Sequence, residues 1–143
     1  MRILFFHRLD LVHLYAPVSK ILRSEHDIIH VAFSSHESEI LKLQYGIQEE
    51  VFNLSELRNK LYDTIQVDET ELYSLDDFII KETNGRFCLN SSILIDRTYE
   101  NLIYEEACHI SLAYFKAWEY IFEKTQPKLF LHEPPALFMT HVA

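Results

Sequence analysis

The sequence predicts an α/β domain of the Rossmann-like, three-layer kind, built on a mainly parallel sheet. Apolar runs at residues 3–6, 28–33 and 51–52 are typical of short strands that are buried on both faces. Segments with helical spacing of apolar residues separate these runs. The resulting order of strand, helix, strand, helix, strand favours parallel pairing with right-handed crossovers.

The first strand is predicted over residues 3–6, and a polar and aromatic loop is predicted over residues 7–15. Pro17 suits the first turn of a helix, because its missing N–H has no partner to lose there. The first helix is therefore expected to run from Pro17 to about Glu25. Residues 28–33 form the second predicted strand.

The second helix is predicted to start at Ser34 or Ser35, whose hydroxyl groups are good N-caps. Gly46 is suited to end this helix, since glycine adopts the left-handed conformation without strain. A short third strand is centred on residues 51–52, and a further helix is expected to begin across residues 55–62.

Residues 77–90 are predicted to form a β-hairpin, as an insertion or an edge feature of the sheet. Residues 78–80 and 86–89 are short β-favouring runs, and Asn84-Gly85 stands between them. Asn-Gly is typical of the tight turn of a hairpin.

The strongest helical pattern covers residues 98–124, where apolar side chains recur at spacings of four and three. Pro127 ends it, residues 128–132 form a further strand, and residues 136–142 begin another helix that reaches the end of the chain without a cap. We therefore expect residues 1–143 to be a single Rossmann-like domain. It is expected to be the N-terminal half of a two-domain enzyme, truncated on its C-terminal side.

Composition and charge narrow the function. The net charge of −9 argues against nucleic-acid binding, which needs clustered basic side chains. Most of that charge, −8, lies between Glu37 and Glu82, which include twelve acidic and four basic residues. With only two glycines, the chain forms neither the G-x-G-x-x-G dinucleotide motif nor a P-loop.

The sequence also predicts a cytoplasmic protein. Cys88 and Cys108 are an isolated pair, expected to be reduced thiols in the core. The apolar run at residues 3–6 is too short for a signal peptide. No stretch approaches the ~20 apolar residues that span a bilayer.

Two segments follow predicted strand ends, where open parallel sheets bind their ligands. The loop after the first strand carries His7, Arg8, Asp10, His13 and Tyr15. A histidine here can act as general base, because its ordinary pKa is near ~6.5. Arginine can hold a carboxylate or phosphate with two hydrogen bonds, and aspartate can orient a histidine.

The second segment is residues 132–135, in which two prolines stiffen the chain after Glu133. The predicted catalytic residues are His7 and Glu133, and the predicted substrate-binding residues are Arg8, Asp10, His13 and His132. A structural interpretation competes with each: the first loop caps the sheet with ordinary polar groups, and Glu133 complements the dipole of the next helix.

No metal and no cofactor are predicted. Glu106 and His109 would share one helix face, but a di-metal carboxylate site needs two such Glu-x-x-His motifs and further glutamates. The other histidines lack the spacing of zinc ligands.

Four segments together resemble the first domain of GT-B glycosyltransferases and of bacterial surface-carbohydrate and capsule biosynthesis proteins. They are the opening strand at residues 1–6, the strand at residues 26–33, the Asp-Arg pair within residues 95–98 and the strand at residues 126–133 that ends in Glu. Lys128 departs from the pattern, which has an acidic residue after the proline.

This resemblance implies an acceptor-side domain of a polysaccharide glycosyltransferase, inactive without a C-terminal domain that binds the nucleotide-sugar donor. It implies metal-independent transfer, with His7 or Glu133 as base and Arg8 in the cleft. The implied partners are a sugar or glycolipid acceptor, the chain's own C-terminal domain and, for the full enzyme, the membrane surface. Three alternatives stay open: half of a nucleotide-sugar 2-epimerase, a stand-alone α/β binding or regulatory module, and a non-catalytic partner of a glycosyltransferase.

Overall fold

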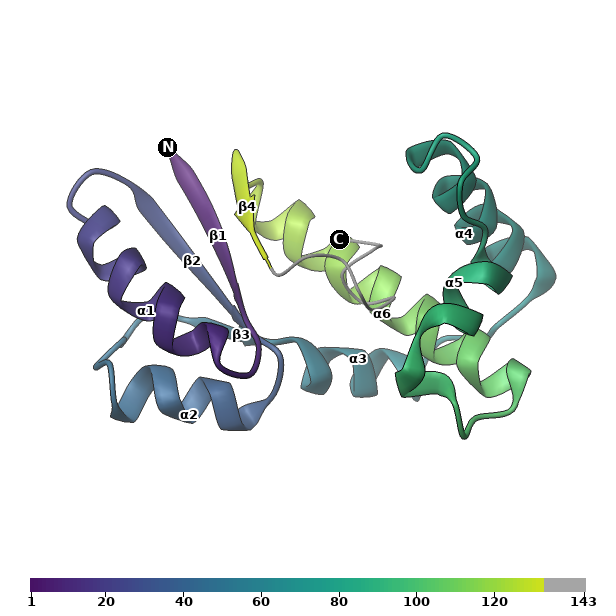
Figure 1. The fold of residues 1–143 in the computed structure, drawn as a ribbon, viewed down its shortest axis with the longest axis horizontal. Helices are drawn as coiled ribbons and strands as arrows, with labels where there is room; N and C mark the ends of the chain where they lie inside the picture. The colour runs from purple at the N-terminus through teal and green to yellow at the C-terminus, as the bar shows by residue number, and fades with distance from the viewer. Residues whose placement is uncertain (133–143) are drawn as a thin grey trace. The chain divides into compact units, whose positions relative to one another are not determined.

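The computed structural model describes residues 1–132, which form strands alternating with helices (Figure 1). The elements in order are β1 Arg2–His7, α1 Leu11–Leu22, β2 Asp27–Ala32, α2 Ser35–Leu43, β3 Val51–Asn53, α3 Leu54–Tyr62, α4 Glu69–Glu82, α5 Leu89–Ile95, the 3-10 helix η1 Arg97–Tyr99, α6 Tyr104–Thr125 and β4 Leu129–Leu131. Among the described residues, 1–57 and 120–132 form one compact unit, the sheet unit, and 58–119 form a second, the helical unit. The single Rossmann-like domain that the sequence suggests for residues 1–143 stays a prediction.

The sheet has four strands in the order β3-β2-β1-β4, and all pairs are parallel. Phe5 lies opposite His30 of β2 on one side and Leu131 of β4 on the other. The predicted fold class, a Rossmann-like α/β domain with a parallel sheet, is confirmed. The strands predicted near residues 3–6, 28–33, 51–52 and 128–132 all form.

Helices cover both faces of the sheet, because alternate side chains point to opposite faces. Val12 and Ala16 of α1 and Leu41 of α2 pack with Ala32 on one face. On the other face, the ring of Phe122 in α6 meets Phe130 of β4 edge-on, with centroids 5.5 Å apart. These layers bury Leu4, Phe5 and Phe6 completely, as expected of a central strand.

Helix α1 begins six residues earlier than the sequence predicted, so Pro17 lies inside it rather than in its first turn. A tight turn after β1 makes this early start possible. Leu9 takes a left-handed conformation with φ of 48°, and the N–H of Leu11 donates to the carbonyl of Arg8 at 3.1 Å. Pro17 is exposed on the surface of α1.

Helix α2 starts at the predicted cap. The hydroxyl of Ser34 accepts from the N–H of His36, and the carboxylate of Glu37 accepts from the N–H of Ser34 at 3.0 Å, which completes a capping box. Gly46 follows the helix with φ of 63°, and its N–H donates to the carbonyl of Lys42. Glycine is needed here because this backbone conformation strains other residues.

The hairpin predicted over residues 77–90 does not form; this region is helical. Helix α4 runs through residues 78–80, with Asp68 as its N-cap and Leu75 and Ile79 on its buried side. Asn84 and Gly85 have φ of 53° and 76°, and they reverse the chain after the helix instead of joining two strands. A short apolar run does not distinguish a strand from a buried helix segment.

The helix predicted over residues 98–124 starts later, at Tyr104. Before it, the carboxylate of Asp96 accepts from the N–H and the hydroxyl of Thr98, at 2.8 and 2.7 Å, and begins the separate helix η1. The helix predicted at residues 136–142 lies outside the described residues. Within residues 1–132, no helix has the length and apolar character that crossing a membrane requires.

Candidate functional site at the strand switch point

The strand order reverses between β1 and β4. From β1 the chain proceeds outward to β2 and β3, and then returns to place β4 on the other side of β1. In open parallel sheets, such a switch point opens a crevice at the carboxyl ends of the two strands, where ligands bind. His7 ends β1, and His132 directly follows β4. The two predicted histidines therefore flank this position.

His7, the predicted base, is completely buried. Its Nε2 lies 2.9 Å from Nδ1 of His30, and the two rings stack with centroids 5.1 Å apart. The pair forms because Phe5 and His30 are register partners, so that His7, two residues beyond Phe5, points to the same face.

Burial controls the charge of this pair. It lowers the pKa of His7 to about 3, with the nearby His30 as a second cause. It also lowers the pKa of His30 to about 4, against the opposing effect of Glu49. Both imidazoles are therefore neutral at physiological pH, since removing a charged ring from water is unfavourable.

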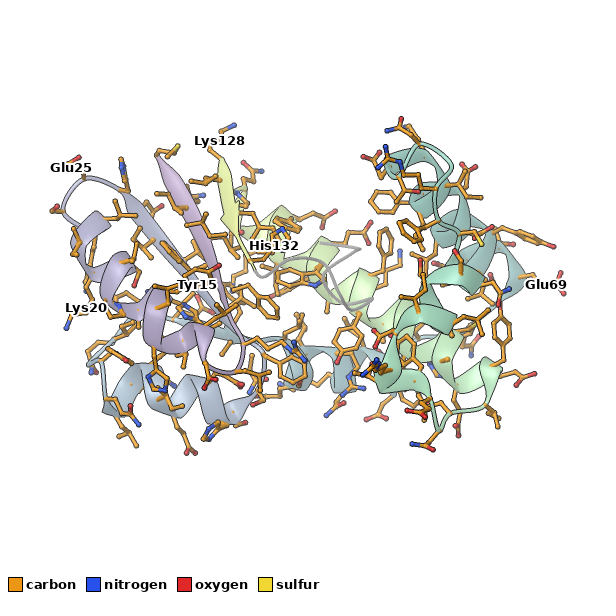
Figure 2. All side chains as sticks on the ribbon, viewed as in Figure 1. Tyr15, Lys20, Glu25, Glu69, Lys128 and His132 are labelled. Atoms are coloured by element: carbon orange, nitrogen blue, oxygen red, sulfur yellow. The ribbon has the colours of Figure 1, made fainter. Side chains whose placement is uncertain are left out.

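Tyr15 joins α1 to the end of β4. Its hydroxyl donates to the carbonyl oxygen of His132 at 3.1 Å, and its ring meets His7 edge-on with centroids 6.2 Å apart (Figure 2). The ring of His132 stacks on Phe130 at 4.7 Å. Tyr15 therefore contacts both His7 at the end of β1 and His132 just after β4.

The loop after β1 is held by a buried carboxylate. Glu37 of α2 accepts from the N–H of Leu9 at 3.2 Å in addition to its bonds with Ser34. The guanidinium of Arg8 lies over the ring of Phe33, 5.5 Å from its centroid. Asp10 precedes α1, is exposed and makes no capping bond with its side chain.

His13 lies elsewhere than the sequence suggested. Its Nδ1 is 2.8 Å from the hydroxyl of Tyr45, beyond the end of α2. The structure therefore brings His7 and His132 to the switch point, places Arg8 and Asp10 in the adjoining loop and directs His13 to Tyr45. Glu133, the other predicted catalytic residue, lies outside the described residues.

Sequence reasoning missed His30, which contacts His7 most closely. A histidine inside an apolar strand resembles an ordinary core residue when the strand is considered alone. The register of β1 against β2 is needed to show that His7 and His30 lie on the same face of the sheet.

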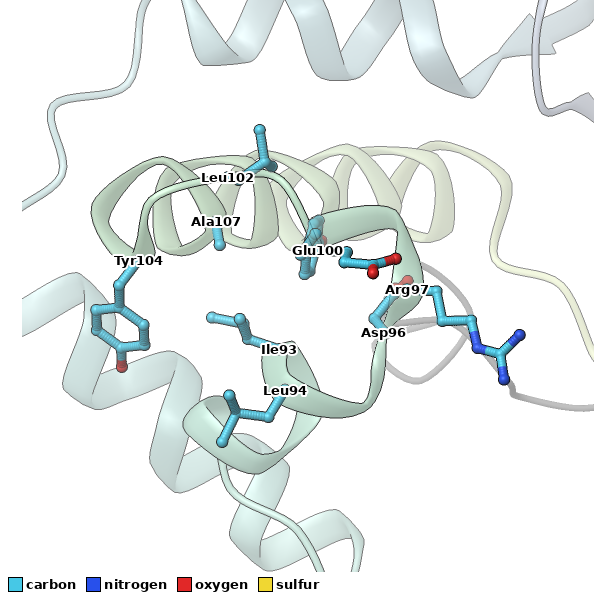
Figure 3. A pocket seen from close by; sticks show the side chains of 9 residues that line it. Ile93, Leu94, Asp96, Arg97, Glu100, Leu102, Tyr104 and Ala107 are labelled. Carbon is cyan, nitrogen blue, oxygen red and sulfur yellow. The ribbon is translucent and has the colours of Figure 1, made fainter.

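The helical unit has its own hollow, of about 400 Å³, within the size range of small-molecule pockets (Figure 3). Ile93, Leu94 and Ala107 form its apolar part, and Tyr104 stands at one side. Arg97 belongs to the rim, but Figure 3 shows its guanidinium pointing away from the hollow. The buried carboxylate of Asp96 also lines this hollow, and it accepts from the N–H and the hydroxyl of Thr98.

The described residues contain no group of three or more histidine, cysteine, aspartate or glutamate side chains arranged for a metal ion. The ring of His109 instead stacks on Tyr62, with centroids 3.8 Å apart.

The strand order and the polar cluster at its reversal define the class of the protein: an open-sheet, Rossmann-like α/β protein with a candidate site at the switch point. Comparisons with protein-family models, with curated proteins and with solved structures found no match for the chain. The likeness to GT-B glycosyltransferases stays a prediction from the sequence.

Proposed function

We propose that this chain is the acceptor-side domain of a GT-B-type glycosyltransferase of surface or capsular polysaccharide synthesis, acting in the cytoplasm. The observation that carries the proposal is the placement of His7, Tyr15 and His132 together where β1 and β4 end. A sugar acceptor needs a group that removes a hydroxyl proton and polar groups that orient the ring. In this proposal, His7 is the candidate for the first role, and Tyr15 and His132 are the candidates for the second.

In this proposal each side chain has a distinct task. His7 is the base that takes the proton of the attacking hydroxyl, because a neutral imidazole has a free lone pair. Tyr15 and His132 border the position of the sugar, and Arg8 binds an anionic part of the acceptor. Glu133 is the alternative base. The nucleotide-sugar donor binds a second domain, and the acceptor is a sugar or a glycolipid.

The test is a transfer assay with the full-length protein, a panel of nucleotide sugars and sugar or glycolipid acceptors, analysed by mass spectrometry. We expect one product, heavier than its acceptor by one sugar residue. Tyr15→Phe removes the hydroxyl that binds His132 but keeps the ring, and we expect a loss of about tenfold in rate, the value of about one hydrogen bond.

His36→Gln is the matched control, since His36 is exposed on α2. Its rate should equal that of the wild type. A full panel without transfer would contradict the proposal, as would equal rates for Tyr15→Phe and His36→Gln. An epimerised nucleotide sugar as the product would support the epimerase alternative instead.

A further inference from the structure

His7 and His30 share a single hydrogen. Nε2 of His7 and Nδ1 of His30 lie 2.9 Å apart, so one of these atoms carries the proton and the other accepts it. Because each neutral imidazole has one N–H, this choice also fixes the outer atoms, Nδ1 of His7 and Nε2 of His30. The pair therefore has two neutral arrangements.

Nδ1 of His7 distinguishes the two arrangements. It is buried, and no hydrogen-bond partner for it exists among residues 1–132. A buried N–H without an acceptor loses its full hydration, and orphaned donors are rarer in proteins than orphaned acceptors. The favoured arrangement leaves this atom as a bare lone pair, so that Nε2 of His7 donates to His30.

The other ring faces charged groups. His30 lines a cavity of about 10 Å³, close to the space of one water molecule, together with Ser19, Lys20, Arg23 and Glu49. Glu49 forms an ion pair with Arg23. A carboxylate beside His30 favours an N–H on the outer nitrogen of that ring, which is the same arrangement that leaves Nδ1 of His7 bare.

From this geometry we infer that His30 is the positioning residue of His7: it fixes the tautomer with a bare Nδ1 and, with Glu49, forms the exit for the proton that Nδ1 takes up. The inference rests on the proposed function for its second half, in which an acceptor hydroxyl supplies that proton. The first half describes the resting protein alone.

The proton balance closes without a charged ring. The O–H bond of the acceptor breaks and an N–H bond forms at Nδ1 of His7. The hydrogen on Nε2 of His7 moves to Nδ1 of His30. The hydrogen on Nε2 of His30 passes across the small cavity to the carboxylate of Glu49, whose buried oxygens, apart from the ion pair with Arg23, accept no hydrogen bond among the described residues in the resting protein. The acceptor oxygen keeps the electron pair with which it attacks the sugar, and both imidazoles end neutral.

This relay accounts for a base that is too deeply buried to become a cation. Burial and His30 lower the pKa of His7 to about 3, so that simple protonation of this ring is unfavourable. The titratable and charged groups around the pair are Tyr15, Lys20 and Arg23 of α1 and Glu49 of the segment before β3. Among them, Glu49 offers the carboxylate that receives a proton.

The first experiment is nitrogen-15 NMR of the histidine rings in the full chain, without any ligand. We expect an unprotonated signal for Nδ1 and a protonated signal for Nε2 in His7, and the same order in His30, whose Nδ1 accepts from His7. Both rings should stay neutral on titration down to about pH 5, since the two pKa values lie at about 3 and about 4. A protonated Nδ1 in His7, or titration near the ordinary value of ~6.5, would overturn the inference.

Glu49→Gln tests the exit, with Glu50→Gln as matched control, because Glu50 pairs with Lys124 at 3.2 Å and does not line the cavity. We expect Glu49→Gln to lower the pKa of His30 further, since Glu49 raises it, and Glu50→Gln to leave it unchanged. Equal pKa values for His30 in the two variants would overturn the assignment of Glu49.

The relay itself is tested in the transfer assay. Glu49→Gln should lower kcat by about tenfold or more with KM unchanged, Glu49→Asp should restore part of the rate, and Glu50→Gln should match the wild type. An active enzyme that is indifferent to Glu49→Gln overturns the relay. A protein with the expected NMR tautomers and no transferase activity contradicts the proposed function and leaves the positioning role of His30 supported.

Discussion

The sheet unit and the helical unit bury their polar groups in different ways. The sheet unit encloses ionisable side chains, His7, His30 and Glu37, near the carboxyl edge of its strands. The helical unit buries the carboxylate of Asp96 and hydroxyl groups, such as that of Ser111, which donates to the hydroxyl of Tyr99 at 3.2 Å. The two buried histidines, whose pKa values lie well below the ordinary value, therefore add a pH dependence to the stability of the sheet unit.

The largest expected effect is acid destabilisation of the sheet unit. His7 and His30 have folded-state pKa values of about 3 and about 4. Both lie below the unfolded value of ~6.5, so their stabilising contribution is complete above that value and is lost as the pH falls towards the folded values. At about pH 5 the pair lowers the free energy of unfolding by about 4 kcal/mol relative to about pH 8.

Urea unfolding at these two pH values measures the loss. His30→Gln removes one member of the pair and should reduce the pH dependence by about half. His36→Gln, an exposed histidine of α2, should keep all of it. Identical pH dependence in both variants would contradict the burial of the histidine pair.

The next effect separates the two units by their apolar cores. Leu4 of β1 and Leu75 of α4 are both buried, with 0% and 1% exposure. Each Leu→Ala change should lower the free energy of unfolding by about 3 kcal/mol, because it leaves a cavity. Hydrogen exchange should then report faster exchange in β1 and β2 for Leu4→Ala, and in α4 and α5 for Leu75→Ala.

Leu4→Met and Leu75→Met are the controls for this pair, since volume-conserving changes cost less than about 1.5 kcal/mol. If either alanine variant accelerated exchange equally throughout the chain, the two units would be one cooperative body, and their division by contacts would have no energetic meaning.

The two units also differ in how far their sequence predicted them. In the sheet unit, β1 is an apolar run that is buried from Ile3 onward, and β2 is buried over its last three residues, a pattern with few structural alternatives. In the helical unit, residues 78–80 fit a strand and a helix equally well. The decisive evidence was the spacing of Leu75 and Ile79 behind the N-cap Asp68. Asn84-Gly85 was misleading because a left-handed pair ends a helix as readily as it turns a hairpin.

The candidate site was predicted in position more than in detail. Because ligands bind at the carboxyl ends of parallel strands, the sequence alone was enough to predict where His7 and His132 lie. The burial of His7 and its contact with His30 depend on the register of β1 against β2, which no local pattern contains. His13 contacts Tyr45 because α1 begins at Leu11 and includes His13, whereas the sequence predicted this residue in a loop.

A smaller effect comes from the carboxylates that tie segments together in each unit. Glu37 accepts from the N–H groups of Leu9 and Ser34, whereas Asp76 accepts from the N–H of Leu89 at 2.6 Å. Glu37→Gln exchanges one acceptor oxygen for a donor at a buried position and should cost about 2 kcal/mol. Asp76→Asn keeps one acceptor oxygen and should cost about 1 kcal/mol.

Thermal or urea unfolding compares these variants with Glu39→Gln on α2 and Asp77→Asn on α4, two exposed carboxylates. The exposed pair should stay within about 0.5 kcal/mol of the wild type. If Asp76→Asn lowered the free energy of unfolding more than Glu37→Gln, the buried carboxylate of the sheet unit would not be the more important of the two for stability.

The smallest effect tests whether the two units tolerate the same backbone change equally. Gly46 follows α2 with φ of 63°, Gly85 follows α4 with φ of 76°, and a Cβ added at either position would meet no atom within 4 Å. The cost of Gly→Ala therefore comes only from the left-handed backbone, about 1 kcal/mol at each site. Equal losses in urea unfolding are expected. A clearly larger loss of unfolding free energy for Gly46→Ala would mean that the chain between α2 and β3 cannot relax. The cost at that helix end would then depend on the rigidity of the sheet as well as on the local backbone conformation.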